Sequence, residues 1–308
     1  MSEEIKNIMP VANNVTYGTV CDFLEVFGKR YPFIDIFEIG KSIRGRSILC
    51  IRLGRYDASA SVVYVGAHHG AESLTSGLLL RYINEFCEYK RDSRRIYGYS
   101  IPFVFCERCV YVIPMLNPDG VENAVYGAST ESPIYERIRA MNKGDDFRLW
   151  QSNERGVDLN HNCNAGFAEY KKIEQQEGIT AGRSKYSGQY PESEPETKAL
   201  CGFIRTAEPK GILTLHTQGE EIYYKSGGYA PPKGENTAKL ISKMSGYSLS
   251  EATGTAAYGG LTDWFIKEFD RPSFTLECGK GTNPLPIKDF ESIYARIRET
   301  LFSFPMML

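Results

Sequence analysis

The chain has 308 residues, of which 42% are hydrophobic, and its formal net charge is −2. This length allows one large core or two small domains, and the balanced charge gives no reason to expect nucleic-acid or membrane partners. No apolar run approaches the roughly 20 residues of a membrane helix. Residues 1–6 are polar and acidic. They lack the basic and apolar parts of a secretory signal, so we expect a cytoplasmic protein.

Strand and helix signals alternate along the chain. Short segments rich in Val, Ile, Phe and Tyr predict strands, and apolar residues at helical spacing predict helices. This alternation predicts an α/β structure, in which helices cover both faces of a mostly parallel sheet. In chain order we expect helix 17–31, strands 34–38, 47–53 and 62–66, helix 73–89, strand 109–115, helices 133–142 and 194–206, strand 211–215, helix 235–245, strand 273–277 and helix 287–302.

The remaining sequence shows no internal repeat and no composition break, so we expect one domain over residues 1–308. The region 144–191 is polar and rich in Gly and Asn, which predicts long and functional loops. The eight cysteines are scattered, and without an export signal we expect reduced thiols. Cys106 and Cys109 form one C-x-x-C, which we interpret as two small core residues in a buried strand over 103–115.

Residues that can bind a metal follow two of the predicted strands. His69 and Glu72 come after the apolar run 62–65, and His216 comes after the run 211–215. Active sites of open α/β sheets gather at the carboxyl ends of the strands. Two ligands close together and one distant ligand are a common way to build a catalytic zinc site.

Each of these residues also has a structural explanation. Glu72 could favour a helix start through the helix dipole, and His216 could be a hydrogen-bonded histidine at the core edge. His68 competes with His69 for the ligand role, because its spacing to Glu72 is sterically possible too. A zinc hydrolase also needs a base. Glu277, at the end of another apolar run, is the candidate, and a Glu paired with Arg or Lys is the alternative.

In this order, the residues resemble the zinc metallocarboxypeptidases of the carboxypeptidase A type. The resemblance covers most of the chain and favours His69 over His68. It implies a three-layer α/β/α domain with a mixed, mostly parallel sheet of about eight strands, one Zn²⁺ per chain and a peptide substrate. The matching segments are His69-x-x-Glu72, Asn117-Pro118-Asp119-Gly120, Gly156-Val157-Asp158-Leu159-Asn160, His216, Asp263-Trp264 and Glu277.

The resemblance also implies roles for single residues. The two histidines and Glu72 would bind zinc, and Glu277 would activate the zinc-bound water and pass its proton to the leaving amine. Asp158 would hold the second ring nitrogen of His69. Asn160 would bind a carboxylate or amide of the substrate.

Two departures from the family pattern concern arginines. His161 follows Asn160 where an arginine usually grips the C-terminal carboxylate of a peptide, and histidine is a shorter and pH-dependent partner. The usual position of the arginine that polarises the scissile carbonyl holds Gln151. Arg148 and Arg155 are possible substitutes, and we favour Arg155 because it is nearer to the matched segment.

Two further departures concern the substrate pocket. The family's substrate-capping tyrosine aligns with Thr255, and Tyr258, three residues away, is expected to serve instead. The specificity position holds Thr262, which is small and polar and does not suit a large apolar side chain.

Within the family, the chain is similar to the bacterial γ-D-glutamyl-diamino acid peptidases, which cut peptidoglycan stem peptides between D-Glu and diaminopimelate or lysine. We therefore predict hydrolysis of this bond in muropeptides, in a chain without an accessory LysM domain. The alternatives are an ordinary zinc carboxypeptidase for L-peptides and a non-catalytic binding module on the same fold. The similar segments are 150–160, 216–220, 245–256 and 277–286.

Overall fold

Eight strands form the main sheet, in the order β1-β2-β6-β3-β7-β10-β8-β9. The neighbours β6, β3, β7 and β10 run parallel, as do β8 and β9, whereas β1–β2, β2–β6 and β8–β10 are antiparallel. This mixed, mostly parallel sheet confirms the predicted fold class. The strands are β1 (Asp35–Lys41), β2 (Ser47–Leu53), β3 (Ala60–Val65), β6 (Arg108–Ile113), β7 (Gly211–His216), β8 (Glu221–Tyr223), β9 (Ser248–Ser250) and β10 (Ser273–Glu277), and a separate pair is formed by β4 (Arg95–Ile96) and β5 (Tyr99–Ser100).

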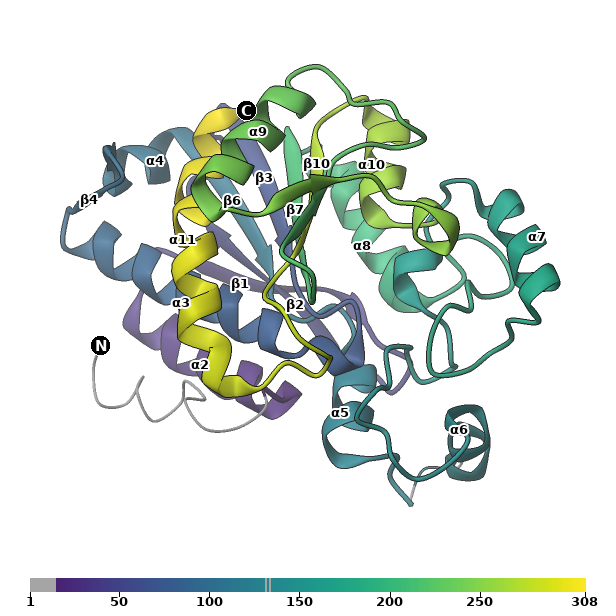
Figure 1. Ribbon diagram of the computed structural model, residues 1–308. Coiled ribbons are helices and arrows are strands. Elements are labelled where there is room, and N and C mark those ends of the chain that lie inside the picture. The colour runs from purple at the N-terminus through teal and green to yellow at the C-terminus, as the bar shows by residue number, and fades with distance from the viewer. Residues whose placement is uncertain (1–14, 131, 133) are drawn as a thin grey trace.

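Helices cover both faces of the sheet in the computed structural model (Figure 1), which describes residues 15–130, 132 and 134–308. One layer contains α2 (Tyr17–Arg30), α3 (Leu74–Arg91), α9 (Gly234–Ser245) and α11 (Phe290–Met307). The opposite layer contains α8 (Pro195–Ala207) and α10 (Leu261–Phe269). The remaining helices are α4 (Ile101–Glu107), α5 (Pro118–Tyr126), α6 (Tyr135–Asn142) and α7 (Phe167–Glu177).

The central strand β3 is apolar at successive positions because both of its faces are buried. Val62 and Tyr64 join the core cluster that includes α3 and α11. Val63 and Val65 join the second cluster, which includes α8 and α10. Successive side chains of a strand point to opposite faces, so a strand covered on both faces needs apolar residues throughout.

The prediction of a buried strand over 103–115 was wrong in its first half. Residues Ile101–Glu107 form α4, and only Arg108–Ile113 form β6. Pro102 stands in the first turn of α4, where no backbone N–H is needed, so the helix starts there without a lost hydrogen bond. Cys109 is buried as predicted, but Cys106 is exposed, so only one of the pair is a core residue.

Several elements escaped prediction because they are short or lie in polar sequence. They include α5, α7, α10, β8 and β9, and α7 lies within the region 144–191, for which the sequence predicts long loops. No helix of the described part of the chain is long and apolar enough to cross a membrane. The expectation drawn from residues 1–6 and the predicted helix start at Pro133 fall outside the described residues.

Candidate metal centre

The neighbouring parallel strands β3 and β7 deliver the predicted metal ligands to one edge of the sheet. Val65 pairs with Thr214, so the chain that follows β3 lies beside His216 at the end of β7. His69 and Glu72 sit in a short turn directly after β3. Gly70 allows this turn, because a Cβ there would lie 2.2 Å from the carbonyl oxygen of Gly120.

Three side chains that can bind a metal converge at this edge. His69 Nδ1 lies 2.9 Å from Glu72 Oε1 and 3.3 Å from His216 Nδ1, and His216 Nδ1 lies 3.1 Å from Glu72 Oε2. Zinc–ligand bonds of about 2.0–2.1 Å in a tetrahedron place neighbouring ligand atoms roughly 3.3 Å apart. The donor set and its spacing therefore fit zinc, with His69, Glu72 and His216 as the ligands.

Asp158 fixes the orientation and the tautomer of His69. Asp158 Oδ1 lies 3.1 Å from His69 Nε2, and its second oxygen accepts a hydrogen bond from the backbone N–H of Lys185 at 2.9 Å. Burial by itself raises the pKa of Asp158, but the nearby His69 and His161 and these hydrogen bonds hold its pKa well below the usual range. An ionised carboxylate only accepts hydrogen bonds, so Nε2 carries the proton and Nδ1 keeps its lone pair for a metal.

His68 lies beside the centre but does not join it. Its ring centroid is 5.0 Å from that of His216, and both of its ring nitrogens are buried without a hydrogen-bond partner among the described residues. Burial lowers the pKa of His68 well below its ordinary value, so the ring is neutral. The contacts of the two rings thus favour His69 over His68, a choice that the spacing alone leaves open.

Glu277 ends β10 and lies directly opposite His216 of β7. Burial, together with the negative charge of Glu72, raises the pKa of Glu277 to about 8. Its carboxylate forms no ion pair with any described Lys or Arg, in contrast to the structural alternative weighed from the sequence. A partly buried carboxyl group without a counter-ion, next to a metal centre, is typical of a catalytic acid or base.

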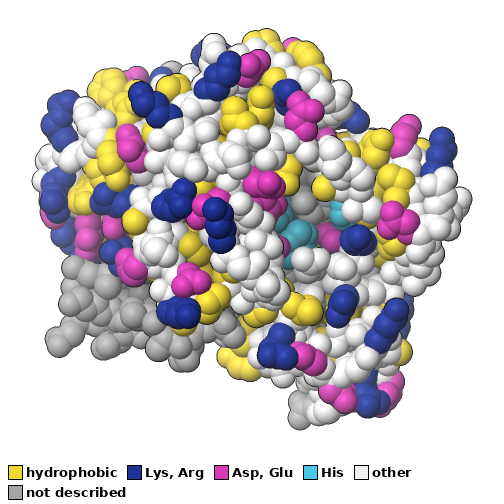
Figure 2. All heavy atoms as spheres, in the orientation of Figure 1, with side chains coloured by type: hydrophobic (Ala, Val, Ile, Leu, Met, Phe, Trp, Pro, Cys, Tyr) yellow, Lys and Arg dark blue, Asp and Glu magenta, His cyan; other side chains and the backbone are white. Residues whose placement is uncertain are grey.

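These groups open into a cleft of about 220 Å³. Figure 2 shows histidine and acidic side chains at the bottom of this hollow. The predicted residues Asn160, His161 and Thr262 line it, together with groups that no sequence argument assigned to the site. The unassigned lining residues include Lys185 and Tyr223, and Gln151 and Asp263, which the family resemblance had aligned, also line the cleft.

Comparison with known proteins decides the family. The family described as zinc carboxypeptidase matches residues 20–300 of this chain. The chain belongs to the zinc carboxypeptidase family. It is therefore a zinc-dependent peptidase, as the motifs predicted, and the three convergent side chains form a group that could hold the metal.

The relatives of this zinc carboxypeptidase include enzymes with different names. The chain is 29% identical over 282 residues to the gamma-D-glutamyl-L-diamino acid endopeptidase 1 of Lysinibacillus sphaericus, covering 91% of this chain and 69% of that protein. It is 29% identical over 262 residues to human carboxypeptidase B, covering 78% of this chain and 56% of that protein. The fold is shared with the structure of bovine thrombin-activatable fibrinolysis inhibitor in complex with tick carboxypeptidase inhibitor. The TM-score is 0.71 at 18% identity, and the similarity covers 96% of this chain and 97% of that chain.

The arginine predicted to polarise the substrate is not at the zinc centre. The Arg155 guanidinium lies 3.5 Å from Glu194 Oε2, is half exposed, and lines a different hollow. Arg148 is exposed and pairs with Asp146. Gln151, the residue at the aligned position, lines the zinc cleft instead. Nearness along the sequence was a poor guide, because Gly156, with φ of +74°, turns the chain between Arg155 and Asp158.

Tyr258 is likewise absent from the described lining of the cleft, whereas Thr255 is present. The backbone oxygen of Tyr258 lies 2.9 Å from Nδ1 of His161, so that nitrogen carries a proton and donates. The His161 ring also stacks on Tyr170, with centroids 4.4 Å apart. Both contacts hold the imidazole in one orientation at the cleft wall.

Proposed function

We propose that this zinc peptidase hydrolyses γ-D-glutamyl-diamino acid bonds in peptidoglycan stem peptides, with residues 1–308 as one catalytic domain. The observation that carries the proposal is the lining of the cleft, which contains no arginine among the described residues. An ordinary carboxypeptidase grips the C-terminal carboxylate in bidentate fashion, for which Arg is the residue best suited, whereas Lys185 in the cleft lining offers only a point charge. The 29% identity to a gamma-D-glutamyl-L-diamino acid endopeptidase supports the same substrate class.

One wall of the cleft suits a substrate side chain that carries an amino group. Asp263 and Thr262 line this wall, and burial raises the pKa of Asp263 to about 6, so the carboxyl group is largely ionised at neutral pH. Thr262 Oγ1 lies 2.9 Å from Thr275 Oγ1 and 3.1 Å from Ser273 Oγ, which keeps a polar surface there. A diamino acid has the ammonium group that such a surface can bind.

The chain's own residues carry out the chemistry in this proposal. When bound, zinc supplies a Lewis acid that polarises the scissile carbonyl and acidifies water. Glu277, ionised once the positive charge of the bound metal offsets the burial that raises its pKa, removes a proton from the attacking water and delivers it to the leaving nitrogen. Asp158 keeps His69 oriented, and Asn160 binds a carboxylate or amide of the substrate.

Two further residues shape the substrate site in this proposal. His161 offers its remaining ring nitrogen to the substrate, and the carbonyl oxygen of Tyr258 fixes the ring that does so. Tyr258 then acts by positioning His161 rather than by capping the substrate. The eight free cysteines suit a reducing compartment, which supports the predicted cytoplasmic site of action on muropeptides.

An ordinary carboxypeptidase activity on L-peptides is the second candidate, favoured by the similarity to carboxypeptidase B. Mass spectrometry of the products from L-Ala-γ-D-Glu-meso-diaminopimelate, beside a blocked L-dipeptide and with or without a chelator, separates the two. Chelator-sensitive release of L-Ala-D-Glu is the expected result. Cleavage of the L-dipeptide alone would replace the proposal by the second candidate, and cleavage of neither peptide would overturn both.

A further inference from the structure

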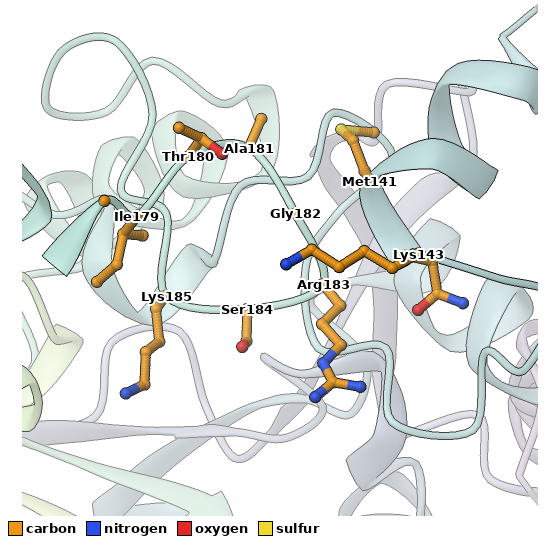
Figure 3. A pocket seen from close by; sticks show the side chains of 11 residues that line it. Met141, Lys143, Ile179, Thr180, Ala181, Gly182, Arg183, Ser184 and Lys185 are labelled. Atoms are coloured by element: carbon orange, nitrogen blue, oxygen red, sulfur yellow. The ribbon is translucent and has the colours of Figure 1, made fainter.

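A second hollow, of about 360 Å³, lies beside the zinc cleft. The end of α6 and the segment 178–185 form its wall. Three of the lining side chains are cationic: Lys143, Arg183 and Lys185. In Figure 3, Lys143 reaches across the hollow, and Arg183 and Lys185 project from the loop in a common direction. None of the lining residues is an Asp or Glu.

These three cations have no counter-ion within the described part of the chain. Other surface cations nearby are paired, such as Arg148 with Asp146 and Lys171 with Glu174. Like charges gathered in a concave surface raise the local concentration of anions. The hollow is therefore prepared for a ligand that brings the missing negative charge.

The loop that carries Arg183 and Lys185 is held in place by backbone hydrogen bonds. The carbonyl oxygen of Arg183 accepts from the N–H groups of Gln151 and Ser152, at 2.8 and 3.1 Å. The N–H of Gly182 donates to the carbonyl oxygen of Gly156 at 3.1 Å. The cations thus stand on a segment already fixed, and a ligand does not have to order it.

Lys185 connects this hollow to the zinc centre, because it lines both. Its backbone N–H donates to Asp158, and its carbonyl oxygen accepts from the Tyr170 hydroxyl at 2.6 Å. These contacts hold Lys185 at φ of +69°, a conformation that is costly for a side-chain-bearing residue. The same Asp158 therefore orients a zinc ligand and the lysine at the entrance to the cationic hollow.

We propose that the hollow is a subsite for substrate carboxylates that lie outside the zinc cleft. The inference rests on the proposed function and adds a means of recognition. A γ-linked glutamyl residue keeps its α-carboxylate free, close to the bond that is cut, whereas an α-linked residue uses that group in the chain. All three cations bind this carboxylate, Lys185 from the entrance and Arg183 and Lys143 from within the hollow, and the last two also bind acidic groups farther along the substrate.

The kinetic test compares L-Ala-γ-D-Glu-meso-diaminopimelate with its isosteric α-carboxamide, in which isoglutamine replaces glutamate. The wild-type enzyme is expected to prefer the carboxylate by about fivefold in kcat/KM, mostly through KM, as for a partly exposed charge pair. Arg183→Gln together with Lys143→Asn should reduce this preference toward unity; Asn tolerates the φ of +60° at position 143. Lys210→Gln, an exposed lysine before β7 at the opposite sheet edge, is the matched control and should keep the preference.

A binding test works without turnover. Glutarate and inorganic phosphate are titrated while the amide resonances of Gly178 and Gly182, which line the hollow, are followed by NMR. Glutarate should shift both resonances in the wild type and in Lys210→Gln, but not in the double variant. Binding of phosphate that is stronger than binding of glutarate would overturn the assignment of the hollow to carboxylates.

The two tests separate the subsite from the proposed function. Equal cleavage of both peptides by the wild type and the double variant would overturn the subsite and leave the function intact. Cleavage of neither peptide, with glutarate binding that depends on Arg183, would overturn the function and keep the subsite. If neither peptide is cleaved and glutarate does not bind, both the subsite and the proposed function are overturned.

Discussion

Replacing Asp158 by Asn removes one negative charge next to His69 and changes no side-chain volume. In the wild type, one Asp158 oxygen faces His69 Nε2 and the other accepts from the backbone of Lys185. An amide can serve only one of these donors with its single oxygen, so its NH₂ group must face the other. The variant therefore loses a charge-assisted hydrogen bond on a zinc ligand.

The size of this loss follows from the bond that disappears. A hydrogen bond to a charged group contributes about 1.5–3 kcal/mol. Loss of a partner that orients a metal ligand typically weakens metal binding by roughly 10–100-fold. Since each 1.4 kcal/mol corresponds to about a factor of ten, the two estimates agree.

Competition with a fluorescent zinc chelator measures this change directly. Asp158→Asn should bind zinc about 10–100-fold more weakly than the wild type, by the same reasoning. Asp57→Asn, at an exposed residue paired with Arg55, is the matched control and should bind zinc normally. Urea unfolding of the metal-free proteins shows whether the fold itself has been damaged. Unchanged zinc affinity in a folded Asp158→Asn protein would refute the role assigned to this carboxylate.

Three further predictions concern the base, a buried carboxyl group and substrate selection. Glu277→Gln should keep zinc, measured by metal analysis, and lose about 10²–10⁴-fold in kcat, because the ligands remain and the base does not; wild-type turnover would remove Glu277 from the mechanism. Burial raises the pKa of Glu196 from 4.5 to about 7, so the folded state holds this proton more tightly than the unfolded chain. Stability from this group is complete below about pH 4.5, falls by roughly 3 kcal/mol between about pH 4.5 and 7, and is constant above that. Urea unfolding at pH 5 and 8 should show a smaller change in Glu196→Gln, and an identical change would contradict the assignment. His161→Arg should raise kcat/KM for peptides with a free C-terminal carboxylate by about tenfold, since Arg binds carboxylates in bidentate fashion; no gain would show that position 161 does not control selection.

The sequence by itself determined five strands of the main sheet and the residues that end them. β2, β3, β6, β7 and β10 were predicted close to their observed positions, because a strand buried on both faces must be apolar at successive residues. The ligands and Glu277 were found for a related reason, as polar residues that follow such runs. Parallel strands bring these ends together whatever the loops do.

Only the tertiary structure decided which residues on loops face the site. Arg155 is closer in sequence to Asp158 than Gln151 is, yet a turn with positive φ at Gly156 directs Arg155 elsewhere and leaves Gln151 in the cleft. Loop side chains follow from local turns and long-range hydrogen bonds, for which the sequence has no periodic signal.

The cationic hollow is the clearest case of loop side chains whose meeting the sequence does not predict. Lys143 ends one helix, and Arg183 and Lys185 lie some forty residues later in a polar region, so no local pattern connects them. They meet because backbone hydrogen bonds attach the loop of Arg183 to Gln151 and Gly156. Residue types and strand ends thus specified the chemistry of the zinc centre, whereas the packing of its loops decided what surrounds it.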